Sequence, residues 1–137
     1  MKKAIVILVL AFMVACSMNI IKKRLPPPFP EKGGIKFQHD APSARQVNLA
    51  GDFPDNLWAG TASSSGRFDD RIDQMYDDGT HGDDVAGDGI WTLIKPLTPG
   101  RYEYKFVKDR NTWVTDPNAV DSTDDGYGGK NSVLIVK

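Results

Sequence analysis

The stretch RYEYKFVKDRNTWVTDP, residues 101–117, decides the fold. Its first half alternates, with Tyr102, Tyr104 and Phe106 on one side of an extended chain and polar or smaller residues on the other. Successive side chains of a strand point to opposite faces, so this alternation predicts a half-buried β-strand. A polar turn at 109–111 follows, and a second short strand begins directly after it. The stretch therefore predicts an antiparallel β-hairpin.

The length of the turn decides which face of the sheet Trp113 occupies. In a three-residue loop, with Asn111 in the left-handed conformation, Val107 pairs with Trp113. Directly paired residues share a face, so Trp113 then lies on the outer face with Val107 and Lys105, while Val114 joins the core side. A four-residue loop would shift the register by one and turn Trp113 inward. We expect the three-residue loop, because the other register would leave Val114 outside.

The rest of the chain from residue 35 repeats a period of about two. Further strand-like runs cover 35–39, 47–51, 90–97 and 132–136, and clusters of Gly, Pro, Asn, Asp and Ser separate them. Neither a helix of useful length nor an internal repeat is apparent. About seven short strands in roughly 100 residues predict an all-β fold, an immunoglobulin-like antiparallel β-sandwich.

Composition and motifs exclude several classes of function. The formal net charge is -1 and 26% of the residues are charged, with both signs interspersed, so there is no basic stripe for nucleic acid. The chain has no HExxH, no Walker loop and no serine nucleophile elbow. Its many Asp residues cluster in turns, whereas a glycosidase needs two carboxylates across a cleft. We expect a non-catalytic protein without a required cofactor.

The N-terminal residues predict export. Lys2 and Lys3 precede twelve apolar residues, AIVILVLAFMVA, and then Cys16, the one cysteine of the chain. This pattern is typical of a signal peptide over residues 1–15. The tail MVAC resembles a bacterial lipobox, which implies that Cys16 is lipidated and anchors the protein to a membrane. An uncleaved membrane anchor and an ordinary signal peptide with an incidental Cys16 are the alternatives.

The expected organisation follows from this signal. Residues 16–34 would form a lipid-anchored, Pro-rich linker, because four prolines in this stretch favour an extended spacer. Residues 35–137 would form the folded domain. The domain would lie outside the cytoplasm, in a bacterial cell envelope.

Three blocks of the sequence resemble a known family. They are VNLAGDFPDNLW (47–58), PGRYEYKFVKDRNTWVTDP (99–117) and GGKNSVLIV (128–136). Together they are similar to the glycogen-binding module of AMP-activated protein kinase β subunits, which also forms the early-set domain of glycogen-branching and starch-debranching enzymes. The resemblance covers nearly all of residues 35–137.

The resemblance implies a module that binds α-1,4-glucans, a polysaccharide partner, without catalysis. The family's stacking and hydrogen-bonding residues match Trp58, Lys105, Trp113 and Asn131 here. Tyr127 lies near the place where some members project a side chain through a cyclic glucan. Many members have lost sugar binding and keep the fold for docking. The alternative function is therefore an envelope protein–protein interaction or scaffolding domain.

The acidic segment MYDDGTHGDDVAGDGIW, residues 75–91, has no counterpart in the kinase-type module. Read as a calcium loop, it places Asp77 first, Gly82 sixth, Asp83 seventh and Asp88 twelfth, which resembles EF-hand spacing. Glycine and histidine stand at the third and fifth positions, where oxygen ligands belong. The alternative is a long hairpin connection whose Asp side chains cap backbone N–H groups and whose glycines supply positive φ.

Overall fold

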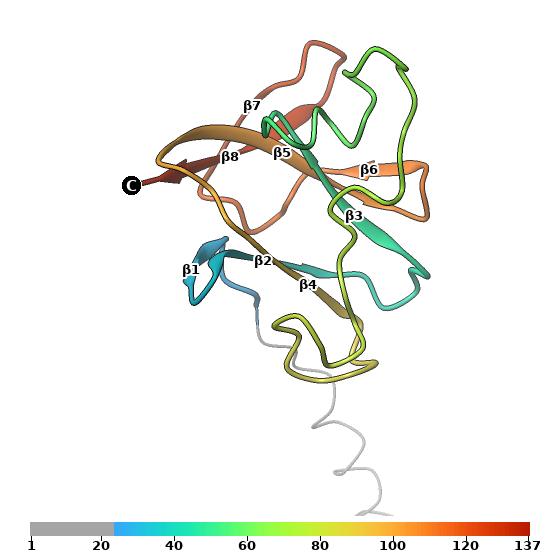
Figure 1. The fold of residues 1–137 in the computed structure, drawn as a ribbon, viewed down its shortest axis with the longest axis vertical. Coiled ribbons are helices and arrows are strands. Elements are labelled where there is room, and N and C mark those ends of the chain that lie inside the picture. Colours follow the sequence, from blue (N-terminus) through green and yellow to red (C-terminus); the bar gives the residue numbers. More distant parts are fainter. Residues whose placement is uncertain (1–23) are drawn as a thin grey trace, which may run out of the picture.

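The computed structural model describes residues 24–137. Every regular element in this part of the chain is a β-strand, and the strands form two packed antiparallel sheets (Figure 1). The predicted all-β sandwich is thus confirmed. The predicted signal peptide, 1–15, and Cys16 lie outside the described residues. Within residues 24–137, no helix is long and apolar enough to cross a membrane.

The smaller sheet has three strands in the order β1-β2-β4. They are β1 (Phe29–Glu31), β2 (Gly34–Asp40) and β4 (Ile90–Lys95). All neighbours are antiparallel, and β2 pairs with β4 along six residues, from Ile35 opposite Lys95 to Asp40 opposite Ile90. A long connection between β3 and β4 therefore crosses from one sheet to the other.

The larger sheet carries the predicted hairpin at its centre. Its strands run in the order β3-β5-β8-β7, and β6 also pairs with β5. β3 pairs with one edge of β5 along 104–108, and β8 and β6 share the other edge, β8 along 100–104 and β6 along 106–108. The five strands are β3 (Val47–Gly51), β5 (Gly100–Lys108), β6 (Thr112–Val114), β7 (Asp121–Asp124) and β8 (Lys130–Val136).

The core fills the space between the two sheets. Tyr104, Phe106 and Phe37 are completely buried, and the rings of Phe37 and Tyr104 meet edge to face with centroids 5.3 Å apart. Tyr102 is also buried, which confirms the predicted inward side of β5. His39 follows the same face of β2 and stacks on Phe106 at a centroid distance of 4.4 Å. Aromatic contacts of this kind contribute beyond the burial of area.

Two strands differ from the sequence-based expectation. β1 and β7 were not predicted, because Phe-Pro-Glu and Asp-Ser-Thr-Asp carry no alternation of apolar residues. β1 also corrects the expected linker boundary at residue 34: Pro30 pairs with Ile35, so the end of the Pro-rich stretch belongs to the sandwich. Arg24 in the same stretch donates to the side chain of Asn118 at 3.0 Å. Backbone pairing takes place here because β1 is an edge strand, where proline is tolerated.

The outer face of the larger sheet is partly covered. Val107 points outward as expected, yet it is completely buried, because the connection after β3 folds over it. Ala50 and Ala59 are buried in the same small cluster, and Trp58 and Phe68 pack against it. This covering segment brings aromatic side chains to the outer face.

Candidate functional site

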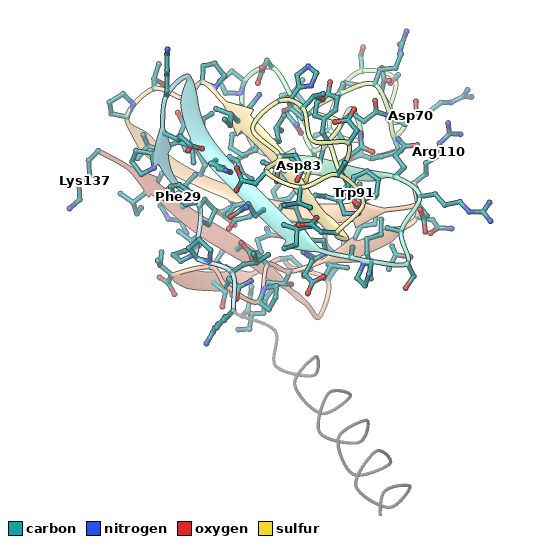
Figure 2. The ribbon with its side chains drawn as sticks, turned by 90° about the horizontal axis from the view of Figure 1, so that it is seen from below. Phe29, Asp70, Asp83, Trp91, Arg110 and Lys137 are labelled. Atoms are coloured by element: carbon teal, nitrogen blue, oxygen red, sulfur yellow. The ribbon has the colours of Figure 1, made fainter. Side chains whose placement is uncertain are left out.

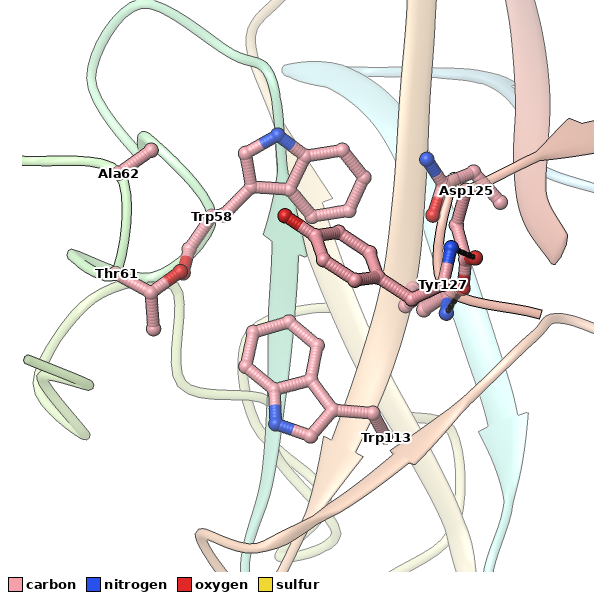
Figure 3. A pocket seen from close by; sticks show the side chains of 8 residues that line it. Trp58, Thr61, Ala62, Trp113, Asp125 and Tyr127 are labelled. Carbon is pink, nitrogen blue, oxygen red and sulfur yellow. Dashed lines mark hydrogen bonds and ion pairs between the residues drawn. The ribbon is translucent and has the colours of Figure 1, made fainter. Parts of the chain in front are cut away.

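A groove of about 580 Å³ opens on the outer face of the larger sheet. Its walls come from five places: the connection after β3, the outward side of β5, strand β6, the turn between β7 and β8, and the start of β8. The groove thus unites segments far apart in the sequence (Figure 3). Its lining residues are Trp58, Thr61, Ala62, Lys105, Trp113, Asp125, Tyr127 and Asn131. All four residues carried over from the family resemblance are among them.

Trp113 reaches the groove through the register of the β5–β6 hairpin. Val107 pairs with Trp113 and Phe106 with Val114, as a three-residue loop predicts. Trp113 is 38% exposed, and its ring meets the edge of the Phe68 ring at 6.2 Å. The indole therefore lies on the outer surface, next to Phe68.

One detail of the predicted hairpin loop is wrong, namely the residue that adopts the left-handed conformation. The positive φ angles fall at Asp109 and Arg110, with values of 50° and 68°, and not at Asn111. The Asp109 carboxylate accepts hydrogen bonds from the backbone N–H groups of Arg45 and Gln46, at 2.8 and 3.1 Å. These bonds hold the turn against the start of β3, and Asp is one of the residues that tolerate a left-handed backbone.

Trp58 stands in an unusual turn. Leu57, Trp58 and Ala59 have φ values of 50°, 58° and 51°, so three successive residues with side chains adopt the left-handed conformation. The backbone N–H of Trp58 donates to the carbonyl of Gly51 at 2.7 Å. The turn thereby folds back on the end of β3 and places the half-buried indole beside the groove.

Asn56 fixes this turn, and sequence reasoning did not identify it. It is 1% exposed, and its side-chain oxygen accepts the N–H groups of Gly51 and Ala59 at 3.0 and 2.6 Å. Its amide donates to the carbonyl of Leu49 and to a carboxylate oxygen of Asp73, at 2.9 and 2.6 Å. An Asn in a turn-forming segment is ordinary in a sequence, so nothing distinguishes a buried one from an exposed one.

Lys105 and Asp125 form an ion pair inside the groove. The Nζ of Lys105 lies 2.7 Å from Oδ2 of Asp125, and the two side chains are 15% and 11% exposed. The Lys105 ammonium, together with the backbone N–H groups of Tyr127 and Gly129, lowers the pKa of Asp125 to about 2. Asp125 was not predicted as a site residue, because nothing in the sequence reveals its pairing across the sheet with Lys105.

Asn131 and Tyr127 complete the lining. Asn131 is 9% exposed, and its amide donates to Glu103 at 3.1 Å. Hydrogen bonds from Arg101 and then from Asn131 lower the pKa of Glu103. Tyr127 is 95% exposed, and its ring faces the groove in the same close view as the two indoles (Figure 3). The groove therefore presents three aromatic rings around a small polar floor.

The acidic loop lies at the other end of the sandwich from the turn between β7 and β8 (Figure 1). It lies over the smaller sheet, where Asp83 is labelled in Figure 2. Backbone N–H groups of Gly79, Gly89 and Ile90 donate to carboxylate oxygens, and the last two bonds are 3.1 and 2.9 Å long. These are the capping contacts expected of a hairpin connection, and Tyr76 and Thr92 close it as a bridge.

The three calcium candidates do come together. One oxygen each of Asp77, Asp83 and Asp88 lies within 4.8 Å of the others. Asp83 is 6% exposed, and Oδ1 of Asp77 is buried without a hydrogen-bond partner. Burial is the main cause that raises the pKa of Asp77. Capping contacts account for one oxygen of each carboxylate, and calcium binding stays a prediction.

Comparison with known proteins assigns this chain to no family. No protein-family model matches the chain, and no curated protein sequence matches it. The chemistry of the groove is therefore derived from the residues that line it.

Proposed function

We propose that this chain is a non-catalytic carbohydrate-binding protein whose groove holds an α-glucan chain. The observation that carries the proposal is the convergence of Trp58, Lys105, Trp113 and Asn131 in one groove on one face. These residues were selected from sequence resemblance, and they come from three separated parts of the chain. Their meeting in one place supports a shared ligand.

The chemistry of the lining suits a sugar. A pyranose ring has an apolar face of C–H groups and a rim of hydroxyls. The exposed face of Trp113 and the half-buried Trp58 can cover the former, and the ammonium of Lys105 and the amide of Asn131 can hydrogen-bond the latter. The groove is open and shallow, so we expect a dissociation constant on the order of micromolar to millimolar.

The proposal includes the location of the protein. A lipidated Cys16 would tether the sandwich to a membrane of the bacterial envelope, with the groove facing an extracytoplasmic polysaccharide. Each buried CH₂ of the acyl chains would contribute about 0.8 kcal/mol to that anchoring.

Affinity electrophoresis of the full chain tests the proposal. Native gels would contain glycogen, amylopectin or no polysaccharide, with a polyoxyethylene detergent, because a detergent with a sugar headgroup could compete for the groove. We expect retardation in both glucan gels. Trp113→Ala and Trp58→Ala should each weaken binding about tenfold or more, since each removes a stacking surface.

Trp91→Phe is the matched control, because Trp91 packs against the core on the other sheet and does not line the groove. It should bind as the wild type does. Equal mobility of folded wild-type protein in all gels would exclude α-glucan binding and favour the envelope interaction protein. Thermal unfolding of each variant shows whether a loss of binding reflects a loss of fold.

A further inference from the structure

The groove holds an ion pair whose two opposite charges sum to zero. Among the described residues that line it, Lys105 and Asp125 are the only ones with charged side chains. Their 2.7 Å contact and low exposure make them one neutral unit. Two further pairs outside the lining are also balanced: Arg101 with Glu103, which accepts from the lining residue Asn131, at 2.9 Å, and Lys130 with Asp124 at 2.8 Å. A ligand entering the groove therefore meets no net charge.

Asp125 also builds the wall opposite the indoles. Its second oxygen, Oδ1, accepts the backbone N–H groups of Tyr127 and Gly129, at 2.7 and 3.0 Å. The backbone N–H of Asp125 donates to the carbonyl of Gly129 at 3.1 Å. One carboxylate thus ties the turn between β7 and β8 to Lys105 on β5. Lys105 keeps two of its three N–H donors for other acceptors.

This arrangement treats neutral and anionic sugars differently. A hydroxyl can accept a hydrogen bond from the free N–H donors of Lys105 while the ion pair stays intact. A carboxylate or sulfate on the ligand would sit a few ångströms from the Asp125 carboxylate, which stays ionised because its pKa is held at about 2. The anion could accept from the same donors, but its charge would then lie beside the Asp125 carboxylate and be repelled by it. Without Asp125, the same lysine would attract anions.

We propose that Asp125 makes the groove selective for uncharged polysaccharide chains, by neutralising Lys105 within the groove and by holding the turn that carries Tyr127. The inference rests on the proposed carbohydrate binding and narrows its ligand class. Asp125 is a positioning and specificity-determining residue here, because its effect on the ligand passes through Lys105 and through the turn.

The test compares one glucan in two charge states. The full chain is run through gels that contain amylopectin or carboxymethylated amylopectin, and the ratio of the two affinities is measured. We expect the wild type to favour the neutral polymer at least tenfold. Asp125→Asn should reduce that preference at least tenfold, mainly by gaining affinity for the anionic polymer. Asn can still accept the two backbone N–H groups, so the turn is preserved.

Two further variants separate charge from structure. Asp124→Asn makes the same change in net charge one residue away, on a side chain that is 84% exposed, and should keep the wild-type ratio. The double variant Lys105→Gln with Asp125→Asn leaves the lining uncharged again and should restore rejection of the anionic polymer. A merely structural role of Asp125 would not give this restoration.

The outcomes are distinct. An unchanged affinity ratio in Asp125→Asn, with amylopectin binding intact in the wild type, would overturn the selectivity role and leave the proposed function standing. A double variant that still prefers the anionic polymer would also overturn it. If folded wild type binds neither polymer, the carbohydrate function fails and the selectivity falls with it.

Discussion

At the scale of single residues, Asn56 decides where Trp58 can lie. A left-handed backbone costs a residue with a side chain about 1 kcal/mol or more, and the turn holds three such residues in succession. Asn56 makes four hydrogen bonds beneath them, two as an acceptor and two as a donor. The buried amide thus compensates for the backbone strain above it.

Replacing Asn56 by Ala should lower the free energy of unfolding by about 3 kcal/mol, because buried N–H and C=O partners lose their bonds. Glucan binding should weaken as well, since the turn that presents Trp58 loses its support. Urea denaturation measures the first effect and affinity electrophoresis the second. Asn111→Ala, at an exposed position in the hairpin loop, is the control and should change stability by less than about 1 kcal/mol. Equal stabilities of the two variants would contradict this role of Asn56.

His39 should make the protein sensitive to acid. Burial, followed by the charge of Lys108, lowers its pKa from 6.5 to about 4, although Asp40 acts in the opposite direction. The unfolded chain therefore binds a proton more readily than the folded protein. The stability contributed by neutral His39 is complete above about pH 6.5 and is lost as the pH falls towards 4, in total about 3 kcal/mol.

Melting temperatures of the wild type and His39→Phe between pH 4 and 7 check this expectation. The variant keeps a ring against Phe106, so the difference between the two curves isolates the titration of His39. That difference should grow in favour of the variant as the pH falls. A constant difference over this range would contradict the prediction.

At the scale of elements, the strands with a periodic pattern were predictable and the edge strands were not. β5 shows strict alternation, and the expectation that Val114 faces the core was enough to give the correct hairpin register. β7 has no apolar residue, and its pairing with β8 follows from the topology alone. The candidate site was also predictable only in part. Its residues Trp58, Lys105, Trp113 and Asn131 were predicted from the family resemblance. The left-handed turn, Asn56 and Asp125 were not, because they depend on tertiary contacts that a sequence does not display.

The end of β4 is tied to the connection after β3 by a buried lysine. Lys95 is 3% exposed, and its Nζ lies 2.8 Å from carboxylate oxygens of both Asp55 and Asp73. The side chain of Asp55 is 71% exposed and that of Asp73 is 18% exposed. Since solvent screens the former contact, the pair with Asp73 should hold the two sheets together at this end.

Two isosteric variants compare the contributions of Asp73 and Asp55 to stability. Asp73→Asn should destabilise the protein by about 3 kcal/mol, because it leaves the buried ammonium without its less exposed partner. Asp55→Asn should cost less than about 1 kcal/mol. Guanidinium denaturation of both variants measures the difference. Equal losses would show that the exposed carboxylate contributes as much as the buried one.

At the scale of the whole molecule, the charge is nearly balanced, with a formal net value of -1, and the groove lining is balanced too. Long-range attraction between exposed charges falls off over about 10 Å at 0.1 M salt, so only a charged ligand would respond strongly to ionic strength. The affinity for a neutral glucan should therefore change less than about twofold between low and high salt. Titration calorimetry at about 0.05 and 0.5 M NaCl checks this, with Asp125→Asn and the anionic polymer as the salt-sensitive comparison.

The position of β8 has a consequence for the order of folding. β8 is the last strand in the sequence, yet it lies between β5 and β7 in the larger sheet. A nascent chain that ends before residue 130 cannot pair β7, because β8 is the one strand among the described residues with which β7 pairs. The first half of β5 would then remain an open edge, available for pairing with other chains. The groove is thus complete only once β8 has paired, because β8 carries Asn131 and joins β7 to β5.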